Sequence, residues 1–124
     1  MIDRQTVDFL CQCEPGVFVD WMLEDGYRYV AGEGRNLVGI ALERIEWMIV
    51  LPVNPADILG ILLEAGFIDL EAYEDLWEIQ DRDSWLFADS VYQIYDECLM
   101  DVCRFLILRD REKIVQFLWD RLKY

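Results

Sequence analysis

The chain has 124 residues, contains no histidine and has few of the other side chains that carry out enzymatic chemistry. It has two serines, Ser84 and Ser90, one threonine, Thr6, and two lysines, Lys113 and Lys123. Without histidine, Ser–His and Cys–His nucleophile pairs are excluded, and so is a di-iron bundle built on Glu-x-x-His pairs. We therefore expect a protein that is not an enzyme and needs no cofactor.

Two short motifs resemble ligand loops but are incomplete. Gly32-Glu33-Gly34 lacks the third glycine of a dinucleotide loop, and Asp81-Arg82-Asp83 lacks the central glycine and terminal glutamate of a calcium loop. Paired carboxylates could still bind a divalent metal for hydrolysis. Because the chain has few basic or polar helpers for such a site, a carboxylate-dependent metal enzyme is the alternative that we disfavour.

The sequence also lacks a long hydrophobic run. Its longest uncharged stretch, Trp47 to Ala56, contains two prolines and is far shorter than the roughly 20 residues that a membrane-spanning helix needs. The first five residues, Met1-Ile2-Asp3-Arg4-Gln5, form neither a basic leader nor an apolar segment. We therefore expect a cytoplasmic protein that does not bind membranes.

Four cysteines are present, and their spacing does not favour a zinc site. Cys11-x-Cys13 is an atypical pair of ligands, and histidine is absent. On a helix, Cys98 and Cys103 would point about 140° apart. We predict reduced, buried or partly buried thiols and no metal.

What the chain does contain is apolar surface for one core. Hydrophobic residues make up 55% of it, including five Trp, six Tyr and six Phe, which is too rich for a disordered chain. We predict a single domain, residues 1–124, folded as a compact all-α bundle of about six short-to-medium helices. Capping residues and apolar periodicity predict helices at 3–13, 17–25, 55–65, 70–80, 85–108 and 111–122. We expect Asp3, Asn54 and Asp69 as N-caps, Gly26 as a left-handed C-terminal residue and Gly66 as the residue that ends the third of these helices.

The segment between the second and third of these helices is ambiguous. Residues 37–51 have helical spacing, but 45–53 could instead form a buried strand. Strand-like composition and turn-forming glycines also allow a short β-hairpin near residues 27–42.

Charge is the most informative feature of this sequence. The chain has 25 acidic and 11 basic side chains, for a net charge of −14. Residues 64–101 hold twelve of the acidic side chains and only one basic one, Arg82, whereas residues 102–124 carry net +3. We expect the bases of this last segment, Arg104, Arg109, Arg111 and Lys113, to pair with the chain's own carboxylates or to complement helix ends. Such a negative domain opposes approach to phosphate, so we expect no direct binding of nucleic acid.

Within the acidic block, carboxylates recur at helical spacing on one face, and neighbouring carboxylates extend the series along the chain. This pattern is typical of a solvated helix face, or of a surface that docks onto a basic groove. The residues predicted to bind a partner are Glu71, Glu74, Asp75, Glu78, Asp81, Asp83, Asp89, Asp96 and Glu97.

Two aromatic residues near these carboxylates, Trp77 and Trp85, are candidates for interface hot spots. Both also fit apolar helical faces, so we favour core packing for both.

These features together predict a non-catalytic module that binds a basic protein, with its oligomeric state left open. We favour an inhibitor that places carboxylates in the basic groove of a nucleic-acid-handling protein, as a phage counter-defence (anti-CRISPR-like) protein or nucleic-acid mimic would. The alternatives are a cytoplasmic immunity protein that neutralises a toxin, and an acidic secretion chaperone.

Overall fold

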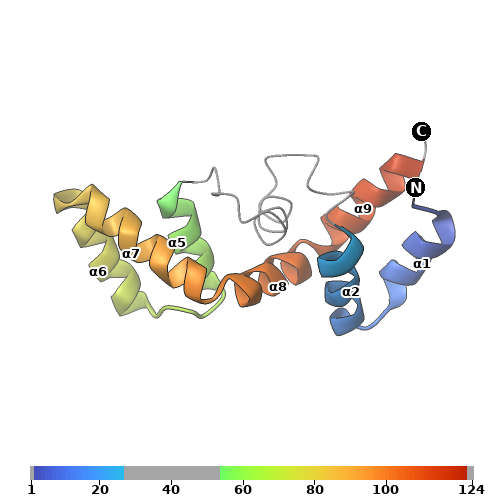
Figure 1. The fold of residues 1–124 in the computed structure, drawn as a ribbon, viewed down its shortest axis with the longest axis horizontal. Coiled ribbons are helices and arrows are strands. Elements are labelled where there is room, and N and C mark those ends of the chain that lie inside the picture. Colours follow the sequence, from blue (N-terminus) through green and yellow to red (C-terminus); the bar gives the residue numbers. More distant parts are fainter. Residues whose placement is uncertain (1, 27–53, 123–124) are drawn as a thin grey trace. The chain divides into compact units, whose positions relative to one another are not determined.

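A computed structural model describes residues 2–26 and 54–122, and every regular element in these two ranges is helical. They contain seven α-helices, one π-helical turn and no strand, which confirms the all-α class. The ambiguous segment 37–53 and the hairpin near 27–42 lie outside the described residues. The described helices divide into two compact units (Figure 1).

The first unit pairs the helix near the N-terminus with the last helix of the chain. Helix α1 (Arg4–Gln12) begins as predicted at Asp3, whose Oδ1 accepts a hydrogen bond of 2.7 Å from the Thr6 backbone N–H. Helix α9 (Arg111–Leu122) packs along α1. Their buried side chains, Val7, Leu10, Ile114 and Leu118, form part of this unit's core.

The second helix of this unit differs from the prediction at both ends. Helix α2 (Pro15–Trp21) starts at Pro15, a residue suited to the first helical turn, and widens into a π-helical turn, Met22–Gly26. The prediction that Gly26 is left-handed is wrong. Gly26 instead continues this π-helical turn beside the buried Met22 side chain. A β-carbon at Gly26 would collide with the thioether of Met22, so the end of that flexible side chain would have to shift if another residue stood there.

Arg111 joins the elements of the first unit. Its Nη2 donates hydrogen bonds to the Leu10 carbonyl at 2.7 Å and the Cys13 carbonyl at 2.8 Å. Its guanidinium also lies 4.7 Å from the centre of the Phe18 ring. Arg111 therefore satisfies carbonyls that the end of α1 leaves without helical partners, as expected for basic residues of the C-terminal segment.

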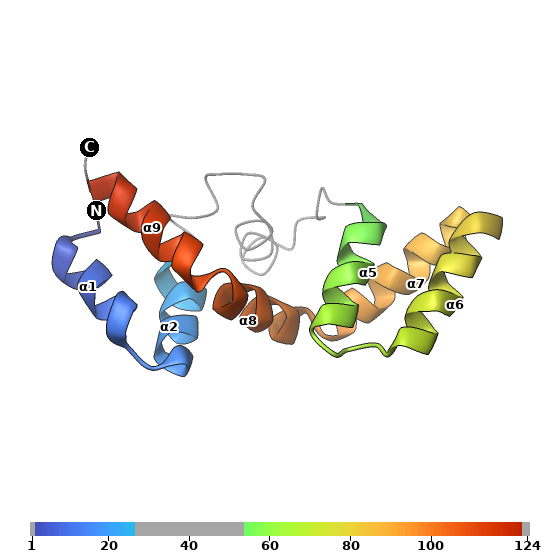
Figure 2. The same cartoon turned by 180° about the vertical axis from the view of Figure 1, so that it is seen from behind.

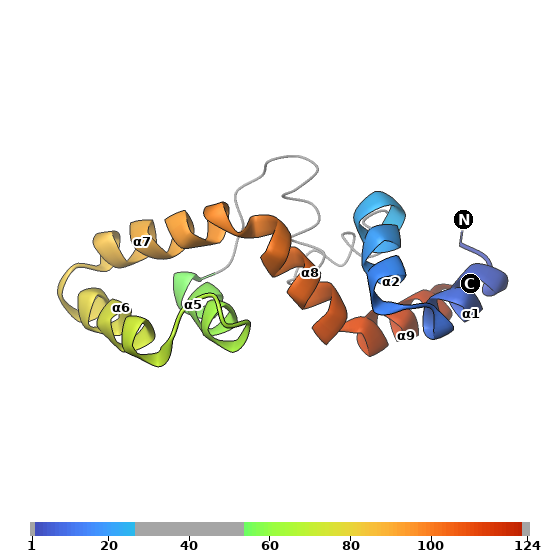
Figure 3. The ribbon, with the colours of Figure 1, turned by 90° about the horizontal axis from the view of Figure 1, so that it is seen from below.

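The second unit is built from α5 (Pro55–Glu64), α6 (Leu70–Arg82) and α7 (Ser84–Glu97). Asn54 caps α5, Asp69 caps α6, and Gly66, with φ of 81°, ends the turn after α5, all as predicted. Figures 2 and 3 show α6 and α7 side by side, joined by a short turn. The buried side chains of the three helices are Ile58, Leu59, Ile61, Leu62, Leu76, Phe87, Val91 and Tyr95.

The single long helix predicted over 85–108 is two helices. Helix α7 ends at Glu97 and α8 (Leu99–Arg109) follows Cys98, which has φ of −118° and ψ of 22°. The Cys98 N–H is shared between the carbonyls of Ile94 and Tyr95, and its thiol donates to the Ile94 carbonyl at 2.9 Å. The regular bond from Cys98 to Ile94 is thus kept, but it is shared with a second carbonyl and with the thiol. No proline or glycine signals this break in the sequence.

Candidate functional site

Helix α6 has a packed face and an acidic face on opposite sides. Leu76 is buried, and Tyr73 and Trp77 are half-buried on the packed face. The Trp77 ring stacks on that of Phe87 from α7, with centroids 5.7 Å apart, and Tyr73 meets Trp77 edge-on at 6.1 Å. The predicted core role of Trp77 is therefore confirmed, and these contacts direct the other face of α6 outward.

The acidic ridge is the outward face of α6, and all of its carboxylates are exposed. None of them forms an ion pair with another residue of the described ranges. Because like charges at i,i+3 and i,i+4 repel, the ridge lowers the stability of α6 unless cations are supplied from outside these residues. The ridge consists of Glu71, Glu74, Asp75, Glu78 and Asp81.

The turn between α6 and α7 forms an exposed tip, defined here as residues 81–86. Asp83 starts α7 without a capping bond from its side chain. Trp85 is 64% exposed and Leu86 is 39% exposed. The prediction that Trp85 packs in the core is wrong, because the buried face of α7 begins at Phe87, roughly 160° around the helix from Trp85.

The remaining predicted carboxylates lie on α7 rather than on the ridge. Asp89 and Asp96 are exposed at positions i+4 and i+11 from Trp85, so they share its helix face. Glu97 is exposed and accepts a 3.5 Å hydrogen bond from Gln93. The structure thus places five predicted residues along α6, Asp83 in the tip and three on α7, all exposed to solvent.

Nearly all of the chain's net charge belongs to the second unit. Residues 54–102 hold thirteen acidic side chains and one basic side chain, a net charge of −12 out of −14. A local charge of this size attracts cations and basic surfaces over a distance of about 10 Å at 0.1 M ionic strength.

In the first unit, by contrast, arginines lie over aromatic rings. Arg4 lies 5.7 Å from the Trp119 ring, Arg109 5.8 Å from Phe105, Arg111 4.7 Å from Phe18 and Arg121 4.4 Å from Phe117. Arg109 also forms an ion pair of 3.2 Å with Asp110, as expected for the basic C-terminal segment. The described cations of this unit are therefore largely engaged within it.

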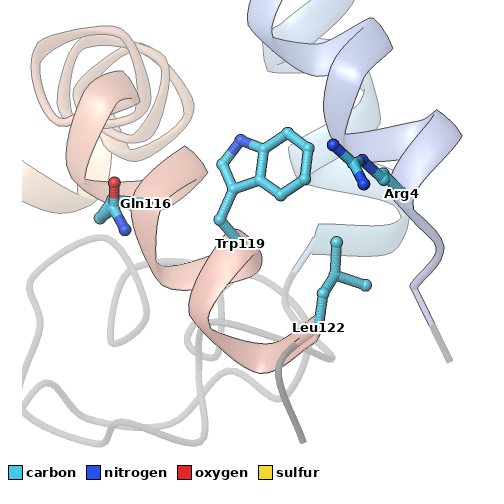
Figure 4. A pocket seen from close by; sticks show the side chains of 4 residues that line it. All are labelled: Arg4, Gln116, Trp119 and Leu122. Atoms are coloured by element: carbon cyan, nitrogen blue, oxygen red, sulfur yellow. The ribbon is translucent and has the colours of Figure 1, made fainter.

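Shallow hollows run along α9 in the first unit. The hollow in Figure 4 has a volume of about 560 Å³ and is lined by Arg4 from α1 and by Gln116, Trp119 and Leu122 from α9. The Trp119 indole points toward Arg4. Over the described ranges no cluster of three or more Cys, Asp or Glu side chains has a geometry that would hold a metal ion.

The cysteines are less uniform than predicted. Cys103 is buried, and Cys13 and Cys98 are half-buried, but Cys11 is exposed on α1. Burial raises the pKa of Cys103 to about 12. Burial, followed by the charge of Asp101, also raises the pKa of Cys98. The prediction of buried or partly buried thiols therefore fails only at Cys11, which lines a shallow hollow beside α9 and stays exposed there.

Comparisons with protein-family models, with curated proteins and with solved structures give no match to this chain. None of the helices in the described ranges combines the length and the apolar character that crossing a membrane requires.

Proposed function

We propose that this chain is a non-catalytic protein that inhibits a nucleic-acid-handling protein by docking its acidic ridge into a basic, phosphate-binding groove. The observation that carries the proposal is the ridge itself, a row of exposed carboxylates without ion-pair partners among the described residues, in a unit of net charge −12. A phage counter-defence protein or another nucleic-acid mimic would act in this way, in the cytoplasm.

The spacing of the ridge supports this mode of binding. Its five carboxylates, from Glu71 to Asp81, span about 15 Å of helix axis, or roughly one charge every 3 to 4 Å. A single DNA strand carries one phosphate about every 3.4 Å along its axis. A groove lined with lysine and arginine to bind phosphates would therefore meet carboxylates at a similar linear density.

The uncompensated repulsion along the ridge also fits a binding role. A surface kept only for solubility is usually a mixture of both charge signs, which avoids repulsion between neighbours. The ridge has no basic residue between Glu71 and Asp81. A basic partner would relieve this repulsion on binding, and the opposite charges would accelerate the encounter.

The experiment that tests the proposal is capture from nuclease-treated lysate at about 0.05 M and about 0.5 M salt, where screening differs strongly. The bait is compared with the double variant Glu74→Lys/Asp75→Lys and with a control, Asp20→Lys/Glu24→Lys. The control changes net charge equally, at two exposed positions of the first unit. We expect the bait to capture a basic protein at low salt, and we expect high salt or added duplex DNA to release it. The ridge variant should fail to capture this protein, whereas the control variant should capture it.

Capture by the ridge variant at full strength would contradict the proposal. A partner that depends on the ridge but is not displaced by DNA would favour the immunity-protein alternative, in which the occupied groove belongs to a toxin.

A further inference from the structure

Among residues 2–26 and 54–122, no cation lies over the ring of the exposed Trp85, although carboxylates surround it in the sequence. Asp81 and Asp83 precede it, and Asp89 follows on the same face of α7. Arg82 is the only basic residue in the range 54–102, and it forms no cation–π contact with the Trp85 ring. A large apolar side chain is therefore held in solvent within a strongly negative environment.

In the first unit, by contrast, several aromatic rings have an arginine side chain beside them. There, Phe18, Phe105, Phe117 and Trp119 each have an arginine guanidinium within 5.8 Å of the ring centre. Such contacts are favourable because the ring face is electron-rich, and Trp is the strongest acceptor among the aromatic residues. The tip has the same kind of acceptor, with carboxylates added, but its one arginine, Arg82, forms no cation–π contact with the Trp85 ring.

We propose that Trp85 is the receptor for an arginine side chain of a basic partner, with Asp81, Asp83 and Asp89 binding the neighbouring cations. The partner is thus a protein segment rich in arginine. Arginine fits better than lysine, because its planar and weakly hydrated guanidinium stacks on an indole while still reaching carboxylates. A nucleic-acid base could also stack on Trp85, but its phosphates would be repelled by the carboxylates.

This inference rests on the proposed function, since it names the chemistry of the partner that the acidic unit would bind. In this scheme, the ridge and the tip contribute different parts of the binding. The ridge attracts any cationic chain through charge, and the tip distinguishes arginine from lysine through the indole.

The test uses the full chain and two labelled peptides, nona-arginine and nona-lysine, titrated by fluorescence anisotropy. We expect the chain to bind nona-arginine about three- to tenfold more tightly than nona-lysine, a range consistent with one partly desolvated cation–π contact. Trp85→Ala should reduce this affinity ratio to the value that the two peptides show when no indole is available. Trp85→Phe should keep part of the preference for arginine. The matched control is Phe9→Ala, which removes an aromatic side chain that is 53% exposed in the first unit and should leave the ratio unchanged.

The ridge variant Glu74→Lys/Asp75→Lys separates the two proposals. It should weaken both peptides by a similar factor and preserve their ratio, whereas Asp20→Lys/Glu24→Lys should weaken them less. An unchanged arginine preference in Trp85→Ala would overturn the receptor inference while leaving the ridge proposal intact. Equal weakening by the two double variants would instead overturn the ridge proposal, and a loss of preference in Trp85→Ala would still support the receptor. Thermal unfolding followed by circular dichroism verifies that each variant is folded.

Discussion

Two cysteines show how strongly the surroundings of one residue change its chemistry in this protein. Cys103 is 1% exposed, and burial raises its pKa to about 12 from an ordinary value of 9.0. Cys11 is exposed on α1. Only the thiolate reacts readily with electrophiles, so burial and the raised pKa both protect Cys103, whereas reagents have access to Cys11.

We therefore predict that iodoacetamide at pH 8 modifies Cys11 rapidly and leaves Cys103 unmodified in the folded chain. The rise of its pKa from 9.0 to about 12 alone reduces the thiolate fraction of Cys103 about a thousandfold. Peptide mass spectrometry after timed quenching measures both sites, and the same reaction in urea should modify all four cysteines. Rapid modification of Cys103 without denaturant would show that its burial is wrongly assigned.

The same thiol predicts a loss of stability at alkaline pH. The unfolded chain releases the Cys103 proton near pH 9.0, whereas the folded chain holds it until about pH 12. Stability from this group is thus fully present below about pH 9 and falls as the pH rises toward 12. Urea unfolding at pH 8 and pH 10 should show a smaller decrease for Cys103→Ala than for the unmodified chain. Equal decreases in the two proteins would assign the effect to other groups.

Helices that begin at a capping residue are well predicted from the sequence. Asp3, Asn54 and Asp69 each accept a backbone N–H of the first helical turn, at 2.7, 2.9 and 2.7 Å respectively. A cap involves residues only two or three positions apart, so no knowledge of the tertiary fold is needed to recognise it. The break at Cys98 was not predicted, because the apolar periodicity continues across it from α7 into α8.

At the scale of one element, we predict that the ridge variant is more stable than the natural chain in the absence of a partner. Glu74→Lys/Asp75→Lys converts repulsive pairs with Glu71 and Glu78 into attractive ones, which should add about 1 kcal/mol at low salt. The gain should shrink at high salt, where surface charges are screened. Urea unfolding at two salt concentrations measures it, and a destabilised variant would indicate that the ridge contributes to folding.

At the scale of the whole molecule, the net charge of −14 makes the folded state repel itself. We predict that the melting temperature rises by several degrees when sodium chloride increases from about 0.02 M to about 0.5 M, because screening reduces this repulsion. Differential scanning calorimetry measures the shift. A fall in melting temperature would mean that attractive ion pairs outweigh the repulsion.

Whether the chain unfolds as a single domain, as predicted from the sequence, is also a property of the whole molecule. The described helices form two compact units, and the boundary between them falls within α8, after Val102. We expect one cooperative unfolding transition, because melting either unit would remove packing from part of α8. Fluorescence at Trp21 and at Trp85, each monitored in a variant with the other tryptophans replaced by phenylalanine, should change at the same denaturant concentration. Separate midpoints would establish two domains.

Sequence alone determined the features of this protein that depend on neighbours along the chain. Examples are the helix starts at Asp3, Asn54 and Asp69, the end of α5 before Gly66 and the carboxylate spacing on α6. Only the tertiary structure decided that Trp77 is packed on Phe87 while Trp85 is exposed, and that the acidic block 64–101 lies within one compact unit. The physical reason is that burial depends on which other element covers a face, and a periodic pattern does not contain that information.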